Sequence, residues 1–149
     1  MDPHAVCVFG APSSGVTSIL QVLADASDEN IAIVAPGDVK ILDAVERAYR
    51  DGAKHVFVDG APHSAAAVQD IVDSRLVWPG HGAIVRVHAE KPFGPATEGG
   101  WRLFSNELPD IERRIRLLSA PYFTVQNTKG DEGLGAAVAE LARRAGIRK

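Results

Sequence analysis

The sequence has few of the features that mark secreted, membrane or metal-binding proteins. It holds one cysteine, Cys7, among 149 residues, which excludes a disulfide within the chain. Cys7 lies in an apolar stretch, which predicts a small buried thiol. The sequence has no signal-peptide pattern and no apolar run long enough to span a membrane. We therefore expect a soluble cytoplasmic protein that has no membrane partner.

Strong positive charge is also missing. The formal net charge is −3, which gives no electrostatic footprint for nucleic acid. The basic residues become denser toward the C-terminal half, where a solvated helix face is the favoured interpretation. The five histidines show no metal-ligand spacing, and no serine–histidine or cysteine–histidine pattern suggests acyl transfer. These absences disfavour nucleic acid as a partner.

A glycine-bracketed turn is present near the N-terminus. An apolar stretch from Val6 leads into Gly10, and the turn continues to Gly15 and Thr17. Glycines allow a tight turn whose N–H groups point at an anion, and a following helix adds the positive end of its dipole. A hydroxyl two positions after the second glycine suits a magnesium ion that bridges phosphates. The predicted phosphate-binding residues are Gly10, Ser13, Ser14, Gly15, Val16, Thr17 and Ser18.

One charged residue is missing from this turn. Val16 occupies the position between Gly15 and Thr17 where a phosphate-binding loop carries lysine. A charge-assisted hydrogen bond contributes about 1.5–3 kcal/mol, so its loss weakens phosphate binding and the stabilisation of transferring charge. The loop is therefore expected to hold a nucleotide and to support chemistry poorly, or not at all.

Apolar runs alternate with helical periodicity along the rest of the chain. This alternation predicts a parallel sheet with helices on both faces, in one domain spanning residues 1–149. Further strands are predicted at 31–34, 55–58, 83–87 and 122–125, and helices at 16–26, up to about 50, after 62, from 109, and at 130–146. The segment 90–100 has no periodicity. Asp38 is a candidate cap for the second helix.

Asp59 ends the third predicted strand, and it has two interpretations. It is either a carboxylate that orients magnesium through water or an ordinary turn aspartate before glycine. Ligands of open parallel sheets bind at the carboxyl ends of the strands, where both Asp59 and the Gly10 turn are expected to lie. The presence of that turn favours the magnesium interpretation.

Several motifs together resemble those of adenylate kinases and related nucleoside monophosphate kinases. Residues 59–64 are similar to the Asp-Gly-Phe-Pro-Arg-Thr signature, and residues 10–18 resemble the phosphate loop except at Val16. Residues 35–38 resemble a Thr-Gly-Asp turn, and 121–130 resemble the last strand and nucleotide-base loop. The resemblance spans nearly the whole chain. It implies an α/β, three-layer P-loop NTPase fold with a five-stranded parallel sheet of order 2-3-1-4-5.

The resemblance also implies roles for individual residues. ATP would donate the phosphoryl group, Thr17 and Asp59 would hold Mg²⁺, and Asp38 and His63 would bind the acceptor. A lid-like loop at about 90–104 would bring arginines onto the transferring phosphate. The residues expected to carry catalysis are Asp59, Arg102 and Arg113.

The acceptor site departs from the family pattern at His63. The family carries an arginine there, and histidine donates fewer hydrogen bonds and is only partly charged near neutral pH. The acceptor is then a nucleoside without a phosphate, or the site has decayed, or His63 simply lies exposed at a helix start. The expected function is ATP-dependent phosphoryl transfer to a nucleotide or nucleoside with weak or altered activity. The alternative is an inactive kinase-like pseudoenzyme that binds a nucleotide or a protein; a protein partner or a homo-oligomer stays open.

Overall fold

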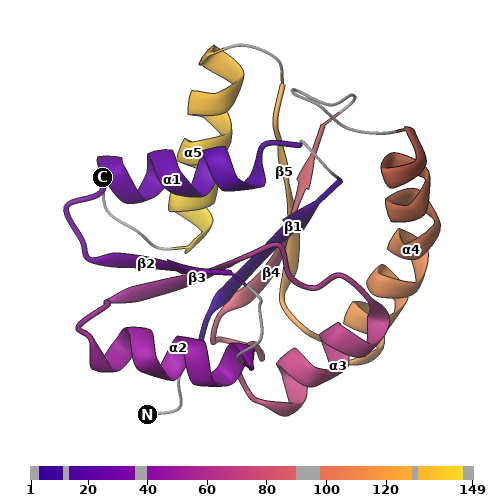
Figure 1. Ribbon diagram of the computed structural model, residues 1–149, viewed down its shortest axis with the longest axis horizontal. Coiled ribbons are helices and arrows are strands. Elements are labelled where there is room, and N and C mark those ends of the chain that lie inside the picture. The colour runs from indigo at the N-terminus through magenta and orange to yellow at the C-terminus, as the bar shows by residue number, and fades with distance from the viewer. Residues whose placement is uncertain (1–3, 12–13, 36–39, 90–97, 129–130, 146–149) are drawn as a thin grey trace.

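A computed structural model describes residues 4–11, 14–35, 40–89, 98–128 and 131–145. Strands and helices alternate along the chain, as the sequence predicts (Figure 1). None of the helices in these ranges combines the length and the apolar character that a membrane span requires. The elements are β1 (Val6–Gly10), α1 (Val16–Ala26), β2 (Ile31–Val34), α2 (Ile41–Arg50), β3 (His55–Asp59), α3 (Ala65–Asp73), β4 (Ala83–His88), α4 (Glu98–Leu117), β5 (Tyr122–Gln126) and α5 (Asp131–Ala145).

The five strands form one parallel sheet in the order β2-β3-β1-β4-β5, which confirms the expected 2-3-1-4-5 topology. The central strand β1 is a short apolar run, because a strand covered on both faces has no side that tolerates polar residues. Its register pairs Val8 with Asp59 of β3 and Gly10 with Val87 of β4. The ends of β1, β3 and β4 therefore meet at one edge of the sheet.

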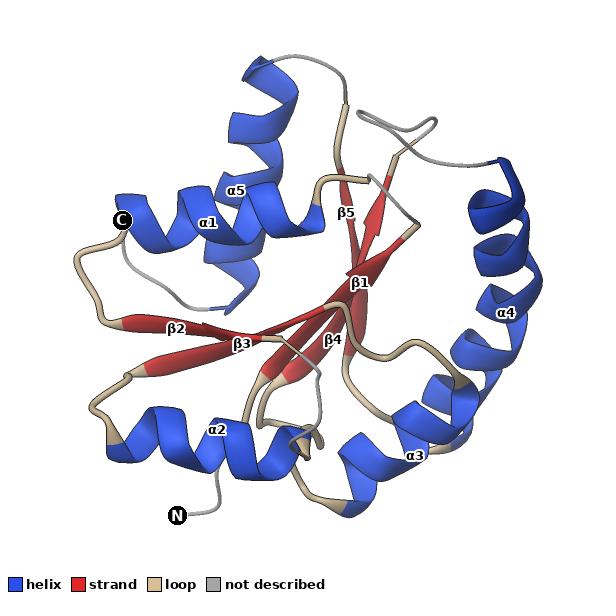
Figure 2. Ribbon diagram, viewed as in Figure 1, coloured by secondary structure: helices blue, strands red, loops and turns tan. Residues whose placement is uncertain are grey.

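Helices cover both faces of this sheet (Figure 2). Successive strand residues point to opposite faces, so Cys7 and Phe9 enter one core while Val8 enters the other. Apolar residues of α2, α3 and α4 form the first core with the sheet, and those of α1 and α5 form the second. The β1–α1 turn consequently lies on one side of the sheet edge, and α4 lies on the other side.

The prediction that a helix begins at Pro109 is wrong. Helix α4 begins at Glu98 and contains Pro109. Phe104, Ile111 and Ile115 pack against the sheet at helical spacing, so one apolar stripe continues past the proline. Pro109 itself is exposed, and solvent can satisfy the backbone carbonyl that it leaves unpaired. The lid-like loop at 90–104 is therefore shorter than predicted, and its part at 90–97 lies outside the described residues.

The prediction that Asp38 caps α2 falls outside the described residues. Among the described residues, Lys40 stands at the N-cap of α2, and its side chain makes no capping hydrogen bond. By contrast, α3 begins with a side-chain cap, because the Ser64 hydroxyl accepts a hydrogen bond from the backbone N–H of Ala67.

Candidate functional site

The turn between β1 and α1 ends at a glycine with a left-handed backbone. Gly15 is the N-cap of α1 with φ 95° and ψ 14°, a conformation that favours glycine. Among the described residues no side chain caps the first turn of α1, so none of them occupies its leading N–H groups. A helix start of this kind, preceded by glycine, can bind an anion. Ser13, one of the predicted phosphate ligands, lies outside the described residues.

Close packing explains the glycine at the start of the turn. A Cβ atom at Gly10 would lie 2.4 Å from the Ser14 Oγ and 2.7 Å from the Val87 backbone oxygen. Ser14 is 1% exposed, and its hydroxyl has no hydrogen-bond partner among the described residues. A buried hydroxyl without a partner is costly, so a ligand oxygen within reach would stabilise the turn.

Asn127 holds this turn against the end of β5. Its side-chain Nδ2 donates a 2.8 Å hydrogen bond to the Ser14 backbone oxygen. Its backbone N–H donates a 2.8 Å bond to the carbonyl oxygen of His88, at the end of β4. Asn127 is 6% exposed, which makes it one of the few buried polar side chains. Residues 121–130 resemble the last strand and nucleotide-base loop of nucleotide kinases, and that resemblance does not indicate this anchoring role.

The two residues predicted to hold magnesium lie together. The Thr17 hydroxyl donates a 2.8 Å hydrogen bond to Asp59 Oδ2, across 42 positions of sequence. The pairing of β1 with β3 makes this contact possible, because it places Asp59 beside Val8 and lets the Gly60 N–H bond to the Val8 oxygen at 2.8 Å. The geometry therefore joins a hydroxyl and a carboxylate at the sheet edge, both of them oxygen ligands suited to Mg²⁺.

A cavity of about 400 Å³ opens above these groups. No lysine or arginine is among its described lining residues, and Asp59 is the one charged residue among them. Attraction for phosphate would then come from backbone N–H groups and the start of α1. The lining residues are Gly10, Ala11, Ser14, Gly15, Val16, Thr17, Ser18, Asp59 and Gly60.

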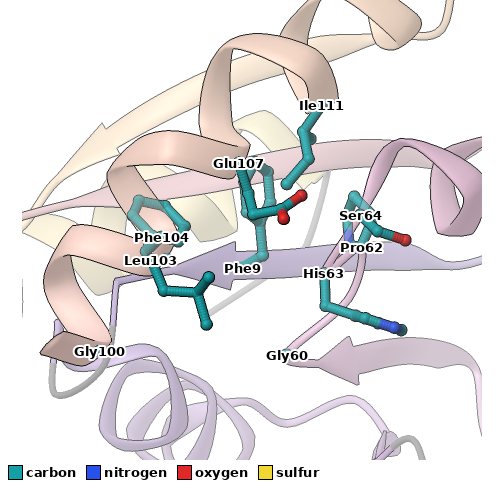
Figure 3. Close-up of a pocket in the computed structure, with 11 residues that line it drawn as sticks. Phe9, Gly60, Pro62, His63, Ser64, Gly100, Leu103, Phe104, Glu107 and Ile111 are labelled. Atoms are coloured by element: carbon teal, nitrogen blue, oxygen red, sulfur yellow. The ribbon is translucent and has the colours of Figure 1, made fainter.

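A second cavity, of about 460 Å³, shares Gly10 and Gly60 with the first. We call the first the phosphate cavity and the second the α4 cavity. Figure 3 shows the α4 cavity between α4 above and the segment after Gly60 below. The predicted residue His63 lines it, together with Glu107, which no sequence motif indicates. The remaining lining residues are Phe9, Pro62, Ser64, Gly100, Leu103, Phe104 and Ile111.

The predicted catalytic arginines do not line either cavity. Arg102 lies on α4 and is exposed, and Arg113 forms an ion pair with Asp110 at 3.7 Å in which both side chains are largely exposed. The neighbouring Arg114 donates a 2.9 Å hydrogen bond from Nη1 to Gln69 Oε1 of α3. Because α4 begins at Glu98, Arg102 lies on a helix rather than in the predicted loop.

A basic pair on β4 was not predicted. Arg86 Nη2 donates a 3.0 Å hydrogen bond to His88 Nδ1, and Arg86 Nε is buried without a partner among the described residues. Ile84, Arg86 and His88 occupy every second position of β4, so their side chains point to the same face of the sheet. Ile84 belongs to the core under α4, and both basic side chains therefore face α4. The sequence signal was the replacement of apolar residues at alternate positions of a buried strand.

Comparisons with known proteins agree on the fold. A gluconokinase from Sinorhizobium meliloti 1021 superposes with a TM-score of 0.54 and 18% identity, over 97% of this chain and 95% of that one. A de novo designed protein of the PLOOP2X3_50 fold gives a TM-score of 0.56 and 17% identity, over 94% and 92% of the two chains. The chain has a P-loop kinase-like fold. At these identities the likeness shows the fold alone.

Sequence comparison adds less. No family model matches this chain. The glycosyltransferase AglJ of Haloferax volcanii is 26% identical over 115 residues, which are 73% of this chain. The chain spans only 38% of the length of that relative. This match does not decide a function.

Proposed function

We propose that this protein is a kinase-like protein that binds ATP with Mg²⁺ in the phosphate cavity and transfers the γ-phosphoryl group weakly to a nucleotide or nucleoside. The observation that carries this proposal is the hydrogen bond between Thr17 and Asp59, 2.8 Å long, at a glycine turn that opens a helix. Hydroxyl, carboxylate and open N–H groups at one strand edge are the parts that phosphoryl transfer requires.

The residues of the phosphate cavity suit the two cofactors. The N–H groups of the turn and of the first turn of α1 would bind the phosphates, and the buried Ser14 hydroxyl offers one further donor. Thr17 and Asp59 would hold Mg²⁺. When bound, this ion neutralises charge on the β- and γ-phosphates.

The acceptor would occupy the α4 cavity, which meets the phosphate cavity at Gly10 and Gly60. Its hydroxyl oxygen would form the new bond to the γ-phosphorus as the bond to ADP breaks and the hydroxyl proton is released. His63 would bind this acceptor. Catalytic roles for Arg102 and Arg113, and ligand roles for Asp38 and Ser13, stay predictions. Cytoplasmic location also stays a prediction.

A second candidate function is a nucleotide-binding pseudoenzyme. Two features of the phosphate cavity favour this function. Val16 occupies the lysine position, and no basic side chain is among the described lining residues. Such a loop would keep its shape for phosphate while stabilising transferring charge poorly. The two functions share ATP binding and differ in ADP release.

Thermal unfolding with Mg²⁺ and ATP tests the shared part first. A ligand at one hundred times its dissociation constant stabilises the folded state by about 2.7 kcal/mol, so the melting temperature should rise. Asp59→Asn should reduce this rise. Asp51→Asn is the matched control, because Asp51 also precedes a glycine but lies at the end of α2. No rise at millimolar ATP would contradict both functions.

A screen for ADP release separates the two functions. The protein is incubated with Mg²⁺, ATP and single nucleosides or nucleoside monophosphates. Release above the rate without acceptor supports the kinase-like enzyme, and Asp59→Asn should abolish it. Binding of ATP with no acceptor-dependent release supports the pseudoenzyme.

A further inference from the structure

The α4 cavity is walled mainly by apolar side chains. Phe9 of β1 and Phe104 of α4 approach with ring centroids 6.3 Å apart and planes tilted by 50°. Leu103, on the same wall, is 63% exposed. Cavities of 300–1,000 Å³ with apolar walls and a few polar groups are typical of small-molecule sites. A volume of about 460 Å³ suits a ring-bearing molecule of nucleoside size.

Glu107 is the one acidic side chain among the described lining residues of this cavity. No hydrogen bond or ion pair engages its carboxylate among the described residues. Figure 3 shows the Glu107 carboxylate and the His63 imidazole on opposite walls, one from α4 and the other from the segment after β3. No arginine or lysine is among the described lining residues. The arginines further along α4 are engaged elsewhere, Arg113 with Asp110 and Arg114 with Gln69.

A half-buried carboxylate with no arginine or lysine beside it among the described lining residues repels a phosphate in the same space. Low local polarity strengthens like-charge repulsion, and the phosphate of a nucleoside monophosphate would bring about two negative charges to Glu107. A neutral ligand has the opposite effect, because its hydroxyl or amino group can donate a charge-assisted hydrogen bond to the carboxylate. The cavity therefore favours the unphosphorylated partner of each nucleoside pair.

We propose that the α4 cavity binds an unphosphorylated nucleoside and that Glu107 excludes nucleoside monophosphates. The base packs against Phe9, Leu103 and Phe104, and Glu107 accepts a hydrogen bond from the ligand. Glu107 is thus a specificity-determining residue. Nucleoside binding to this cavity does not need ATP. The inference rests on the proposed function only where it makes the bound nucleoside the phosphoryl acceptor.

The test is calorimetric titration of the whole chain with adenosine and with AMP, in the absence of ATP, for the wild type and for Glu107→Gln. We expect wild type to bind adenosine at least about tenfold tighter than AMP, since one repelled or hydrogen-bonded charge is worth about this factor. Glu107→Gln should shrink that ratio at least about threefold, by weakening adenosine and strengthening AMP. Cytidine with CMP and thymidine with TMP repeat the comparison for other bases.

Asp110→Asn is the matched control. It removes the same charge from the same helix, but Asp110 is exposed and pairs with Arg113 away from the cavity. The adenosine-to-AMP ratio should not change in this variant. Far-ultraviolet circular dichroism of each variant shows whether the fold is retained. Leu103→Ser, at an already exposed position, offers a second variant that should weaken adenosine without changing the ratio.

Three results would overturn the inference. They are AMP binding as tightly as adenosine in the wild type, an unchanged ratio in Glu107→Gln, and no binding of any nucleoside of the panel. The failure of the proposed function is a separate result. Nucleoside binding with no effect of Mg²⁺ and ATP on thermal unfolding would leave the inference standing and remove the kinase-like function.

Discussion

The phosphate cavity and the α4 cavity meet at Gly10 and Gly60, yet they are built in different ways. The phosphate cavity consists of backbone, hydroxyls and one carboxylate, held in place by hydrogen bonds between distant segments. The α4 cavity consists of apolar side chains with one carboxylate and one imidazole. The first depends on backbone geometry, and the second depends on which side chains a helix presents.

The comparison also shows that the backbone shape of a cavity and the charge of its side chains are set by different residues. The phosphate cavity lies over a glycine turn that opens a helix, with Val16 where a phosphate loop carries lysine. The α4 cavity, which we propose as the acceptor site, is lined by Glu107. On the proposed function, the backbone arrangement for phosphoryl transfer is retained while the charges around it have changed. The following predictions test how far the two regions are independent.

The largest effect is expected at Gly10. Gly10→Ala places a methyl group 2.4 Å from Ser14 Oγ and 2.7 Å from the Val87 backbone oxygen, and that backbone atom cannot rotate away. We expect the free energy of unfolding to fall by about 3 kcal/mol. Chemical denaturation measures it. Gly135→Ala in α5 is the control, because a Cβ there meets nothing within 4 Å, and it should keep or raise stability. Equal stability of the wild type and Gly10→Ala would mean that the turn is not closely packed.

Asn127→Ala should have the next largest effect. It leaves the Ser14 carbonyl without its 2.8 Å partner in a buried place, which costs about 2 kcal/mol of unfolding free energy. It should also weaken binding of ATP with Mg²⁺ and leave adenosine binding unchanged. Asn30→Ala is the matched control, since Asn30 makes the same kind of bond, 2.9 Å to the Gly52 oxygen, in an exposed turn. Equal losses of unfolding free energy in Asn127→Ala and Asn30→Ala would contradict the anchoring role of Asn127.

Thiol chemistry compares a buried and an exposed position on the α4 side of the sheet. Burial raises the pKa of Cys7, whose side chain lies in the core formed with α2, α3 and α4, to about 12, so its thiol stays protonated. We expect an alkylating reagent at pH 8 to modify folded Cys7 about a hundredfold more slowly than unfolded chain. Cysteine placed at the exposed position 103, as Leu103→Cys with Cys7→Ala, should react rapidly. Rapid reaction of Cys7 would show that β1 opens readily.

The same shift has a consequence for stability. A folded pKa above the unfolded value of about 9 contributes stability that is complete below pH 9. That contribution is lost as the pH rises from about 9 toward 12, because the unfolded thiol ionises first. Cys7→Ala should flatten the fall in melting temperature over this window. An unchanged slope would contradict the assignment to Cys7.

The smallest change in stability is expected for Thr17→Val. The Thr17–Asp59 hydrogen bond is exposed, so its removal should cost below about 1 kcal/mol of unfolding free energy. The effect on ATP binding should be much larger when Mg²⁺ is present than when it is replaced by a chelator. Equal effects in both conditions would contradict a magnesium role for this hydroxyl. Adenosine binding in the α4 cavity should not respond.

Much of the fold could be predicted from local patterns. A strand that is buried on both faces is a continuous apolar run in the sequence, as in β1 and β3. A helix that is buried along one stripe has apolar residues at helical spacing, as in α1. The sheet order came from resemblance to a known family. The start of α4 could not be predicted from the proline, because proline is typical of a helix beginning, whereas the apolar stripe of α4 continues through Pro109.

The residues of the two cavities also differ in whether the sequence could predict them. Gly10, Gly15 and Thr17 could be predicted because a phosphate turn needs fixed residue types at fixed spacing. Glu107 could not, since its role depends on the direction in which α4 presents it, and neighbouring acidic residues on a helix look alike in sequence. Asn127 acts on Ser14 across 113 positions, a contact that only the folded sheet creates.

Calorimetric titration with ATP and Mg²⁺, comparing wild type with Val16→Lys, tests the central claim most directly. If the β1–α1 turn is shaped for phosphate and lacks only its cation, the restored lysine should tighten binding about tenfold to a hundredfold. Adenosine affinity, measured on the same two proteins, should stay unchanged. Unchanged ATP affinity in Val16→Lys, or no ATP binding by either protein, would contradict a phosphate-binding role for the turn.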